Sequence, residues 1–323
     1  ADLGSVTDKL EEVGNTDGAL SNRNLIINGS MAVAQRGTSS TTPSAFTTLD
    51  RWYTQEGTGG AVTWSQSSDA PDGFTNSLEI EVTTADTSLA SNEYIRIFQG
   101  IEGNVSAQLA WGSSGAKPAM LSFWVKSSIT GTFGIALQGT PITECYVQTY
   151  TVNSVNTWEY KTIYIAPATT GTWVKDNTRS IRLAFTFGVG SQYSRAASNT
   201  WTSGTDYRGP SGGTNLMGTV GNTFNITGVQ LEVGDTATPF EHRSYGDELA
   251  KCQRYYQKIG YDGGTNVFGA GSWYNSSNAY GYMSFLQTMR AAPTVTAPTA
   301  SNGYKCYAGG STALASTLSF ARV

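Results

Sequence analysis

Hydrophobic and polar residues alternate one by one along several short segments of the chain. Leu78, Ile80 and Val82 are separated by two glutamates, and residues 181–187 alternate in the same way. A period of two places successive side chains on opposite faces of a strand, so these segments predict antiparallel strands with one buried face. Five further segments carry a strand-like pattern: residues 94–98, 120–126, 133–137, 160–165 and 229–233.

The spacing of these segments predicts the fold class. About eight to ten strands over residues 24–240 indicate an antiparallel β-sandwich of the jelly-roll type rather than a smaller immunoglobulin-like module. No repeat of fixed period is present, which argues against a β-helix. The 37 glycines, together with many Ser and Thr residues, suit short strands joined by tight turns. We therefore expect a mainly β protein.

Two segments depart from the β pattern and predict helices. Near the start of the chain, apolar residues recur at steps of three or four between Leu3 and Val13. So short a helix needs partners to be stable, and both a coiled-coil stub of three chains and a frayed helix or linker fit it. Residues 245–258 form the second segment, with Asp247 and Glu248 in its first turn, where the helix dipole favours acids.

The apolar stripe of this second helix predicts assembly. Leu249, Cys252 and Tyr256 share one face, and the roughly sixty β-rich residues that follow make a thin core. We expect a homotrimer with these three residues at its interface, in which the C-terminal part shares its core with identical chains. The expected domains are an N-terminal helical linker (1–23), a jelly roll (24–244), a connecting helix (245–259) and a C-terminal β tip domain (260–323).

Charge and composition exclude several classes of protein. The net charge is −4 and no segment concentrates Lys and Arg, which argues against a nucleic-acid partner. Apolar stretches are interrupted by Gly, Ser, Thr and Asn, so no membrane insertion is expected, and the first four residues lack the pattern of a signal peptide. Cys145, Cys252 and Cys306 lie far apart and predict free thiols rather than disulfides or a zinc site.

Three stretches of the chain resemble bacteriophage tail-fibre proteins when they are taken together. One is similar to the opening of tail-fibre modules, one to their closing strand and exit, and one to the helix that follows. The first two are also similar to the ends of carbohydrate-binding-module jelly rolls. The opening comprises residues 24–31, 35–37 and 50–53, the closing and exit stretch residues 226–234 and 238–245, and the helix residues 248–256.

The resemblance implies a function in host attachment. It implies a structural and adhesive protein of the virion, made in the host cytoplasm, that forms a homotrimer and contacts other phage tail proteins. It also implies that the tail fibre attaches to a host cell-surface glycan or another receptor. The receptor's identity stays open, because the loops between the framing stretches vary freely.

An enzyme is the alternative class, as is a free, monomeric glycan-binding module. A glycan depolymerase needs two carboxylates in an aromatic groove, and Glu79 and Glu81 share one strand face, although such pairs are mostly solvated. His242 is the only histidine and no nucleophile motif accompanies it. We therefore expect no catalysis, no cofactor and no metal, while calcium near Asn28 and Glu232 stays open.

Glycan binding calls for flat aromatic rings beside hydrogen-bonding side chains. The connection of more than thirty residues after residue 188 is long enough to indicate a functional loop, with packing onto a neighbouring chain as the alternative. A second aromatic stretch lies in the C-terminal part. The candidate residues are Tyr193, Trp201 and Tyr207 in the long connection, and Trp273, Tyr274 and Asn275 in the distal stretch.

Other residues of the framing stretches have structural interpretations. Trp52, Tyr53 and Trp124 lie in apolar patterns and are expected in the core. Arg51 follows Asp50 directly, and we expect these two to form an exposed pair that adds little stability. None of these residues is therefore a candidate for binding.

Overall fold

The computed structural model describes residues 22–258, 271–275, 278–281, 284–294, 304–308 and 311–315. The chain divides into two compact units, Ala1–Cys252 and Gln253–Val323. The helix or coiled-coil stub expected before residue 22 lies outside the described residues.

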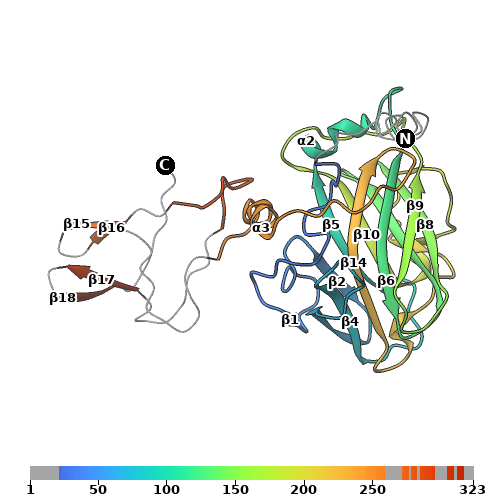
Figure 1. The fold of residues 1–323 in the computed structure, drawn as a ribbon, viewed down its shortest axis with the longest axis horizontal. Helices are drawn as coiled ribbons and strands as arrows, with labels where there is room; N and C mark the ends of the chain where they lie inside the picture. Colours follow the sequence, from blue (N-terminus) through green and yellow to red (C-terminus); the bar gives the residue numbers. More distant parts are fainter. Residues whose placement is uncertain are drawn as a thin grey trace, which may run out of the picture. The chain divides into compact units, whose positions relative to one another are not determined.

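The first unit is a sandwich of two six-stranded antiparallel sheets (Figure 1). The predicted fold class is thereby confirmed. The first sheet has the order β1 (Ser39–Ser40), β3 (Ala61–Ser67), β4 (Ser77–Thr84), β14 (Thr223–Val233), β6 (Ala119–Ser127) and β9 (Glu159–Ile165). The second has the order β12 (Thr202–Ser203), β8 (Glu144–Val152), β7 (Gly131–Gly139), β10 (Arg179–Val189), β5 (Tyr94–Glu102) and β2 (Tyr53–Gly57). A short helix α2 (Gly103–Ser106) and a 3-10 turn η1 (Ala107–Leu109) follow β5.

The hydrophobic core lies between the two sheets and is rich in aromatic rings. Trp52, Trp64, Phe123 and Phe185 are fully buried in it. In β10, Phe185 follows the alternation that the sequence predicts, so Arg182 and the other intervening residues face outward. Burial of these large rings supplies much of the driving force for folding.

The outer face of the second sheet carries charged and aromatic residues where a solvated face ordinarily carries Ser and Thr. Ile95 and Ile97 of β5 belong to the core, which places Tyr94, Arg96 and Phe98 on the outer face. The register sets these side chains beside Tyr53 and Gln55 of β2 and beside Ala184 and Thr186 of β10.

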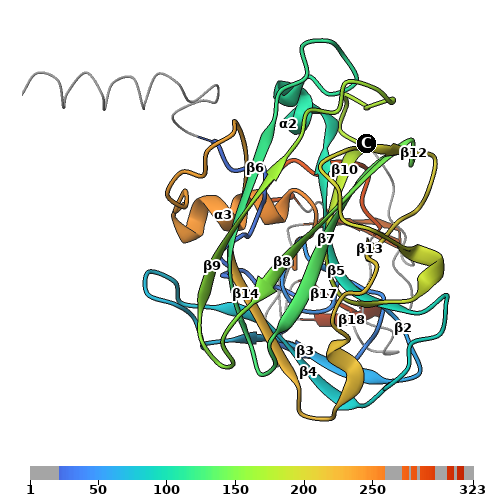
Figure 2. The ribbon, with the colours of Figure 1, turned by 90° about the vertical axis from the view of Figure 1, so that its right-hand side faces the viewer.

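The long connection between β10 and β14 is packed on this outer face (Figure 2). It contains η2 (Ser191–Tyr193), β11 (Ser194–Arg195), β12, β13 (Gly209–Pro210) and η3 (Leu216–Gly218). Two glycines permit the close approach: a Cβ on Gly134 would lie 2.2 Å from Cδ of Pro210, and one on Gly209 would lie 2.6 Å from Cγ2 of Thr186. The connection therefore covers part of this face, and Arg96 of β5 is only 1% exposed beneath it.

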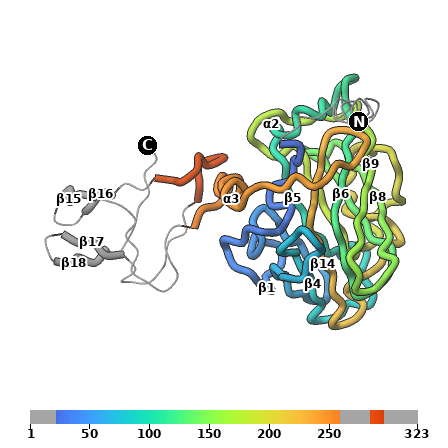
Figure 3. Tube along the Cα trace, in the orientation of Figure 1, coloured from blue at the N-terminus to red at the C-terminus, as the bar shows by residue number. Residues whose placement is uncertain are grey.

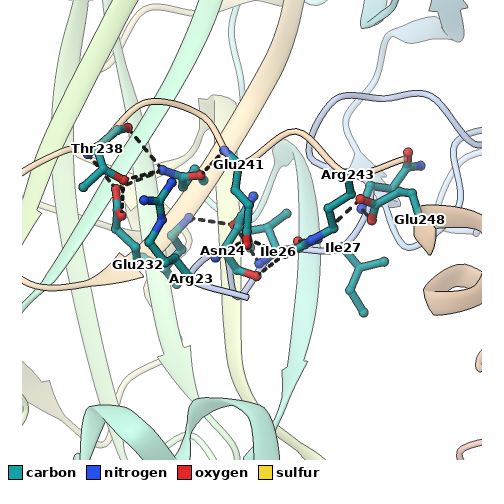
Figure 4. Close-up of polar contacts among 12 residues, drawn as sticks. Arg23, Asn24, Ile26, Ile27, Glu232, Thr238, Glu241, Arg243 and Glu248 are labelled. Carbon is teal, nitrogen blue, oxygen red and sulfur yellow. Dashed lines mark hydrogen bonds and ion pairs between the residues drawn. The ribbon is translucent and has the colours of Figure 1, made fainter. Parts of the chain in front are cut away.

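Polar contacts tie the two ends of the sandwich together in what we call the clasp (Asn24, Ile26, Glu241, Arg243 and Glu248; Figure 4). Arg243 donates to the carbonyl oxygens of Asn24 (2.6 Å) and Ile26 (3.0 Å), and it pairs with Glu241 (3.1 Å) and Glu248 (3.3 Å). The start of the sandwich (blue) and the segment that leads into the second helix (orange) accordingly run close together in Figure 3. The clasp joins the stretches that resemble the opening, exit and helix of tail-fibre modules.

The predicted helix is present as α3 (Tyr245–Gln253), but it is shorter than residues 245–259. Ser244 caps it by accepting a hydrogen bond from the backbone N–H of Asp247 at 3.2 Å. Beyond it the chain follows different contacts: the side chain of Gln257 accepts from the backbone N–H of Leu286 at 2.9 Å. The expected helical continuation to residue 259 is therefore wrong.

The described strands of the second unit form two antiparallel hairpins. β15 (Gly271–Asn275) pairs with β16 (Asn278–Gly281), and β17 (Tyr304–Ala308) pairs with β18 (Ser311–Ala315). In the described part of the chain, no helix is long and apolar enough to cross a membrane.

Candidate functional site

Aromatic rings and guanidinium groups form a row on the outer face of the second sheet. We call this row the arginine–aromatic strip. Strands β2, β5 and β10 supply five of its residues, the packed connection supplies two, and the loop before β2 supplies one. Its residues are Phe46, Tyr53, Tyr94, Arg96, Phe98, Arg182, Tyr193 and Arg208.

At one end of the strip, Arg208 packs against two tyrosine rings that meet edge to face with their centres 5.6 Å apart. Its guanidinium carbon is 3.7 Å from the ring centre of Tyr193 and 4.1 Å from that of Tyr94. Asp206 holds the same guanidinium through hydrogen bonds of 2.7 and 3.1 Å. The hydroxyl of Thr186 also donates to the carbonyl oxygen of Arg208. Backbone and side chain are both fixed, so this end of the strip is preorganised.

The middle of the strip contains two further arginines. Arg96 is only 1% exposed and donates from Nε to the side-chain oxygen of Gln55 at 2.8 Å. Arg182 is half-buried, lies over the ring of Phe98 at 4.7 Å, and donates to the side-chain oxygen of Gln138 at 3.0 Å. Gln138 in turn donates a hydrogen bond of 2.5 Å to the carboxylate of Asp206. Asp206 is therefore the carboxylate to which this network of side chains connects. Arg96 and Arg182 thus donate to the neutral amides of Gln55 and Gln138, while the carboxylate of Asp206 bonds to Gln138 and Arg208.

The pKa values of the arginines record this crowding. Burial, with repulsion from Arg182 and Arg208, lowers the pKa of Arg96 to about 9. Burial, with repulsion from Arg179 and Arg208, lowers the pKa of Arg182 to about 10. Burial alone would raise the pKa of Asp206, but hydrogen bonds from Arg208 and Gln138 outweigh it and lower that pKa. The strip is therefore a positively charged surface at neutral pH.

At the other end, the strip offers aromatic rings to solvent. Tyr53 stacks on Phe98 with ring centres 4.8 Å apart, and Phe46 meets Tyr53 edge-on at 4.9 Å. Phe46 is 39% exposed and Tyr53 is half-buried, which differs from the core position expected for Tyr53. Aromatic faces beside hydrogen-bond donors are suited to bind a ring that is apolar on its faces and polar at its edge.

The three candidate aromatics of the long connection have different positions. Tyr193 lies in the strip. Trp201 packs against Trp111 and other core rings and donates its indole N–H to the carbonyl oxygen of Ala166 at 2.7 Å. Tyr207 packs on the small apolar cluster of Ala136, Cys145 and Val147. Trp201 and Tyr207 thus anchor the connection to the sandwich of their own chain.

The other predicted sites are less fully described. Trp273, Tyr274 and Asn275 lie in β15, and their side chains are outside the described residues, so their role stays a prediction. Cys252 is 1% exposed within its own chain, whereas Leu249 and Tyr256 are half-buried. Both Leu249 and Tyr256 retain surface for the predicted trimer interface.

The residues weighed for catalysis have structural contacts. His242 is exposed and lies against the rings of Phe74 and Phe240, at 5.2 and 4.9 Å. Glu79 accepts a hydrogen bond from Asn225 at 2.9 Å. Among the described residues no three His, Cys, Asp or Glu side chains gather as metal ligands would. The contacts of His242 and Glu79 therefore contribute to the packing of the sandwich.

The expected exposed pair of Asp50 and Arg51 is wrong. Asp50 is buried and accepts hydrogen bonds from Gln35 and Arg36, while Arg51 donates to the carbonyl oxygen of Gly100 at 2.5 Å. Burial raises the pKa of Asp50 against the opposing effect of these partners. Asp50 therefore finds its partners in the loop at residues 35–36 and Arg51 finds one in β5, although the two are neighbours in the sequence.

Arg96, Arg182 and Arg208 were not anticipated as site residues. One signal for them was present in the sequence, because the outward positions of residues 94–98 read Tyr, Arg and Phe. An outer strand face with two rings and a cation is unusual for a solvated surface.

Comparisons with known proteins find distantly similar structures but no family. No family model and no curated protein matches the chain. Among solved structures, the enzymatically active domain of tailspike protein 4 of bacteriophage CBA120 is similar at 13% identity and a TM-score of 0.38, over 66% of this chain and 22% of that one. The family 11 carbohydrate-binding module of the cellulase Lic26A-Cel5E of Clostridium thermocellum is 16% identical, with a TM-score of 0.30, over 62% of this chain and 98% of that one. The module TmCBM61 in complex with β-1,4-galactotriose is 10% identical, with a TM-score of 0.30, over 66% and 100% of the two chains.

Proposed function

We propose that this chain is a non-catalytic, glycan-binding protein whose ligand lies along the arginine–aromatic strip. One observation carries the proposal: Arg208 packs against the rings of Tyr94 and Tyr193, on the sheet face that also carries the partly exposed rings of Tyr53 and Phe46. Rigid rings bind a sugar with little loss of conformational entropy, and the guanidinium donors then fix its orientation.

We further propose that this protein is part of a phage tail fibre, located in the virion, and attaches it to the host surface. The sequence resemblance of the framing stretches supports this role. The clasp supports it as well, because Arg243 links the opening stretch at Asn24 to the helix stretch at Glu248. The three stretches thus act as one structural unit. In a homotrimer, three weak sites would combine into firm attachment to a cell.

Retardation of the protein in native gels that contain soluble polysaccharides tests the binding. Tyr94→Ala with Tyr193→Ala removes both rings around Arg208, and we expect binding to weaken by roughly tenfold or more. Tyr160→Ala with Tyr164→Ala is the matched control, since both tyrosines are exposed on β9 of the other sheet.

Two results would contradict the proposal. Unchanged retardation of a folded Tyr94/Tyr193 variant would exclude the strip, and its loss in Trp273→Ala with Tyr274→Ala would move the site to the distal stretch. Release of reducing sugar from a retarding polysaccharide would show that the protein is an enzyme, against the non-catalytic function that we propose.

A further inference from the structure

We infer that the ligand of the strip is an acidic polysaccharide, whose negatively charged group is bound by Arg182 and Arg208. This inference rests on the proposed function and adds the chemical class of the glycan. It follows from three features of the strip: an excess of positive charge, an arginine with unused donor capacity, and rings placed on both sides of the cations.

The charge of the strip is poorly compensated within the chain. Arg96 and Arg182 each face two other arginines, and Asp206 is the carboxylate that offsets them. Asp206 is already engaged by Arg208 through two hydrogen bonds and by Gln138 through a third. Like charges brought together away from water destabilise one another unless an anion joins them. A ligand carboxylate or phosphate would supply that anion.

Arg182 is the arginine best able to receive it. Its Nε is buried without a hydrogen-bond partner in the described part of the chain, while its Nη1 donates to Gln138. The guanidinium carbon lies 4.7 Å from the ring centre of Phe98, and the residue as a whole is only half-buried. The fork of donors on a guanidinium matches a carboxylate or a phosphate in two parallel hydrogen bonds.

The rings decide between a polysaccharide and a small free anion. Along β5, the rings of Phe98 and Tyr53 lie on one side of Arg96, and Tyr94, with Tyr193 and Arg208 against it, lies on the other side. A single anion would touch only the guanidinium groups. A chain of several sugars would place its charged group on the arginines and neighbouring rings on the tyrosines, and so use the whole row.

The charge of the ligand is tested with two polysaccharides that share a backbone. Polygalacturonate carries a carboxylate on each sugar, whereas its highly methyl-esterified form carries almost none. We expect retardation by polygalacturonate, alginate or polysialic acid, weakened by added NaCl, and little retardation by the methyl ester or by dextran. Wall teichoic acid, which carries phosphate groups instead of carboxylates, tests whether the strip binds phosphate or carboxylate.

Two variants test the role of Arg182 in binding. Arg182→Gln should weaken binding of the retarding acidic polysaccharide at least tenfold, and Arg182→Lys should restore part of it by keeping the charge without the fork. Lys126→Gln, which removes the same charge from β6 on the other sheet, should bind as the wild type does. Thermal melting checks that each variant is folded.

The outcomes separate the two claims. Equal retardation by polygalacturonate and its methyl ester, or by neutral polysaccharides alone, would overturn the inference and leave glycan binding intact. So would a folded Arg182→Gln variant that binds the acidic polysaccharide normally. Retardation by no polysaccharide, neutral or acidic, would contradict the proposed function itself.

Discussion

Glu56 lies in β2 with its carboxyl group partly withdrawn from water, and burial raises its pKa to about 7. Below pH 4 the folded and unfolded states both hold the proton, so the group costs no stability. As the pH rises towards 7, the unfolded chain releases the proton first and the folded state loses stability, until both are ionised. The loss is about 1–2 kcal/mol after allowance for the part of the group that solvent reaches.

Glu56→Gln should therefore stabilise the protein at pH 8 and leave it nearly unchanged at pH 4. Urea unfolding at both values measures this difference, and Glu81→Gln, exposed on β4, serves as the control. Asp50 also has a raised pKa, so the quantity to compare is the change in pH dependence between variant and wild type. Curves that stay parallel would show that Glu56 ionises freely in the folded state.

At the scale of elements, the position of the long connection decides whether the strip exists. Tyr193 and Arg208 reach Tyr94 only because the connection lies flat on the sheet, where Gly134 leaves room for Pro210. Gly134→Ala would place a Cβ 2.2 Å from Cδ of Pro210, and overpacking of this kind costs about 1–3 kcal/mol. We expect the connection to loosen while the sandwich stays folded.

Hydrogen exchange measures this loosening, and gel retardation measures its effect on binding. Exchange should accelerate in residues 190–215 and stay slow in β5 and β10. Gly218→Ala is the control, because its Cβ would meet nothing within 4 Å and its backbone has no positive φ. A Gly134→Ala variant with unchanged exchange would mean that the connection is held by other contacts, such as the indole of Trp201.

Several elements were predictable because their side chains alternate strictly. Residues 181–187 lie within β10, since Phe185 and its neighbours bury a continuous apolar face. β2 was not predicted, because the segment Tyr53–Gly57 reads as polar and gains its place by pairing with β5. The sequence makes Tyr193 a candidate, because it is an aromatic residue in a long connection, but it gives no such reason for Arg96. The partners of Arg96 come from β2, β7, β10 and the connection, and both the pairing of the strands and the packing of the connection bring them together.

At the scale of the whole molecule, attachment needs more than one strip. A single shallow site binds weakly, and three copies raise the overall affinity by a factor of roughly 10²–10⁴ when they can engage the same surface. The predicted homotrimer would provide them. Leu249 on α3 and Tyr256 beyond it are half-buried in their own chain, so part of each side chain is available to a neighbour.

Leu249→Asp with Tyr256→Asp should convert the trimer into a monomer. Light scattering should show a mass of three times 34.4 kDa for the wild type and of 34.4 kDa for the variant. Val220→Asp is the control, because it replaces an apolar side chain that is already 60% exposed on the sandwich with the same charge.

The monomer should keep its retardation by polysaccharide, since the strip lies within one chain, and should lose adsorption to host cells. A wild type that is monomeric in solution, or a double variant that stays trimeric, would refute the predicted interface. Adsorption that survives in a true monomer would mean that one strip binds tightly enough alone.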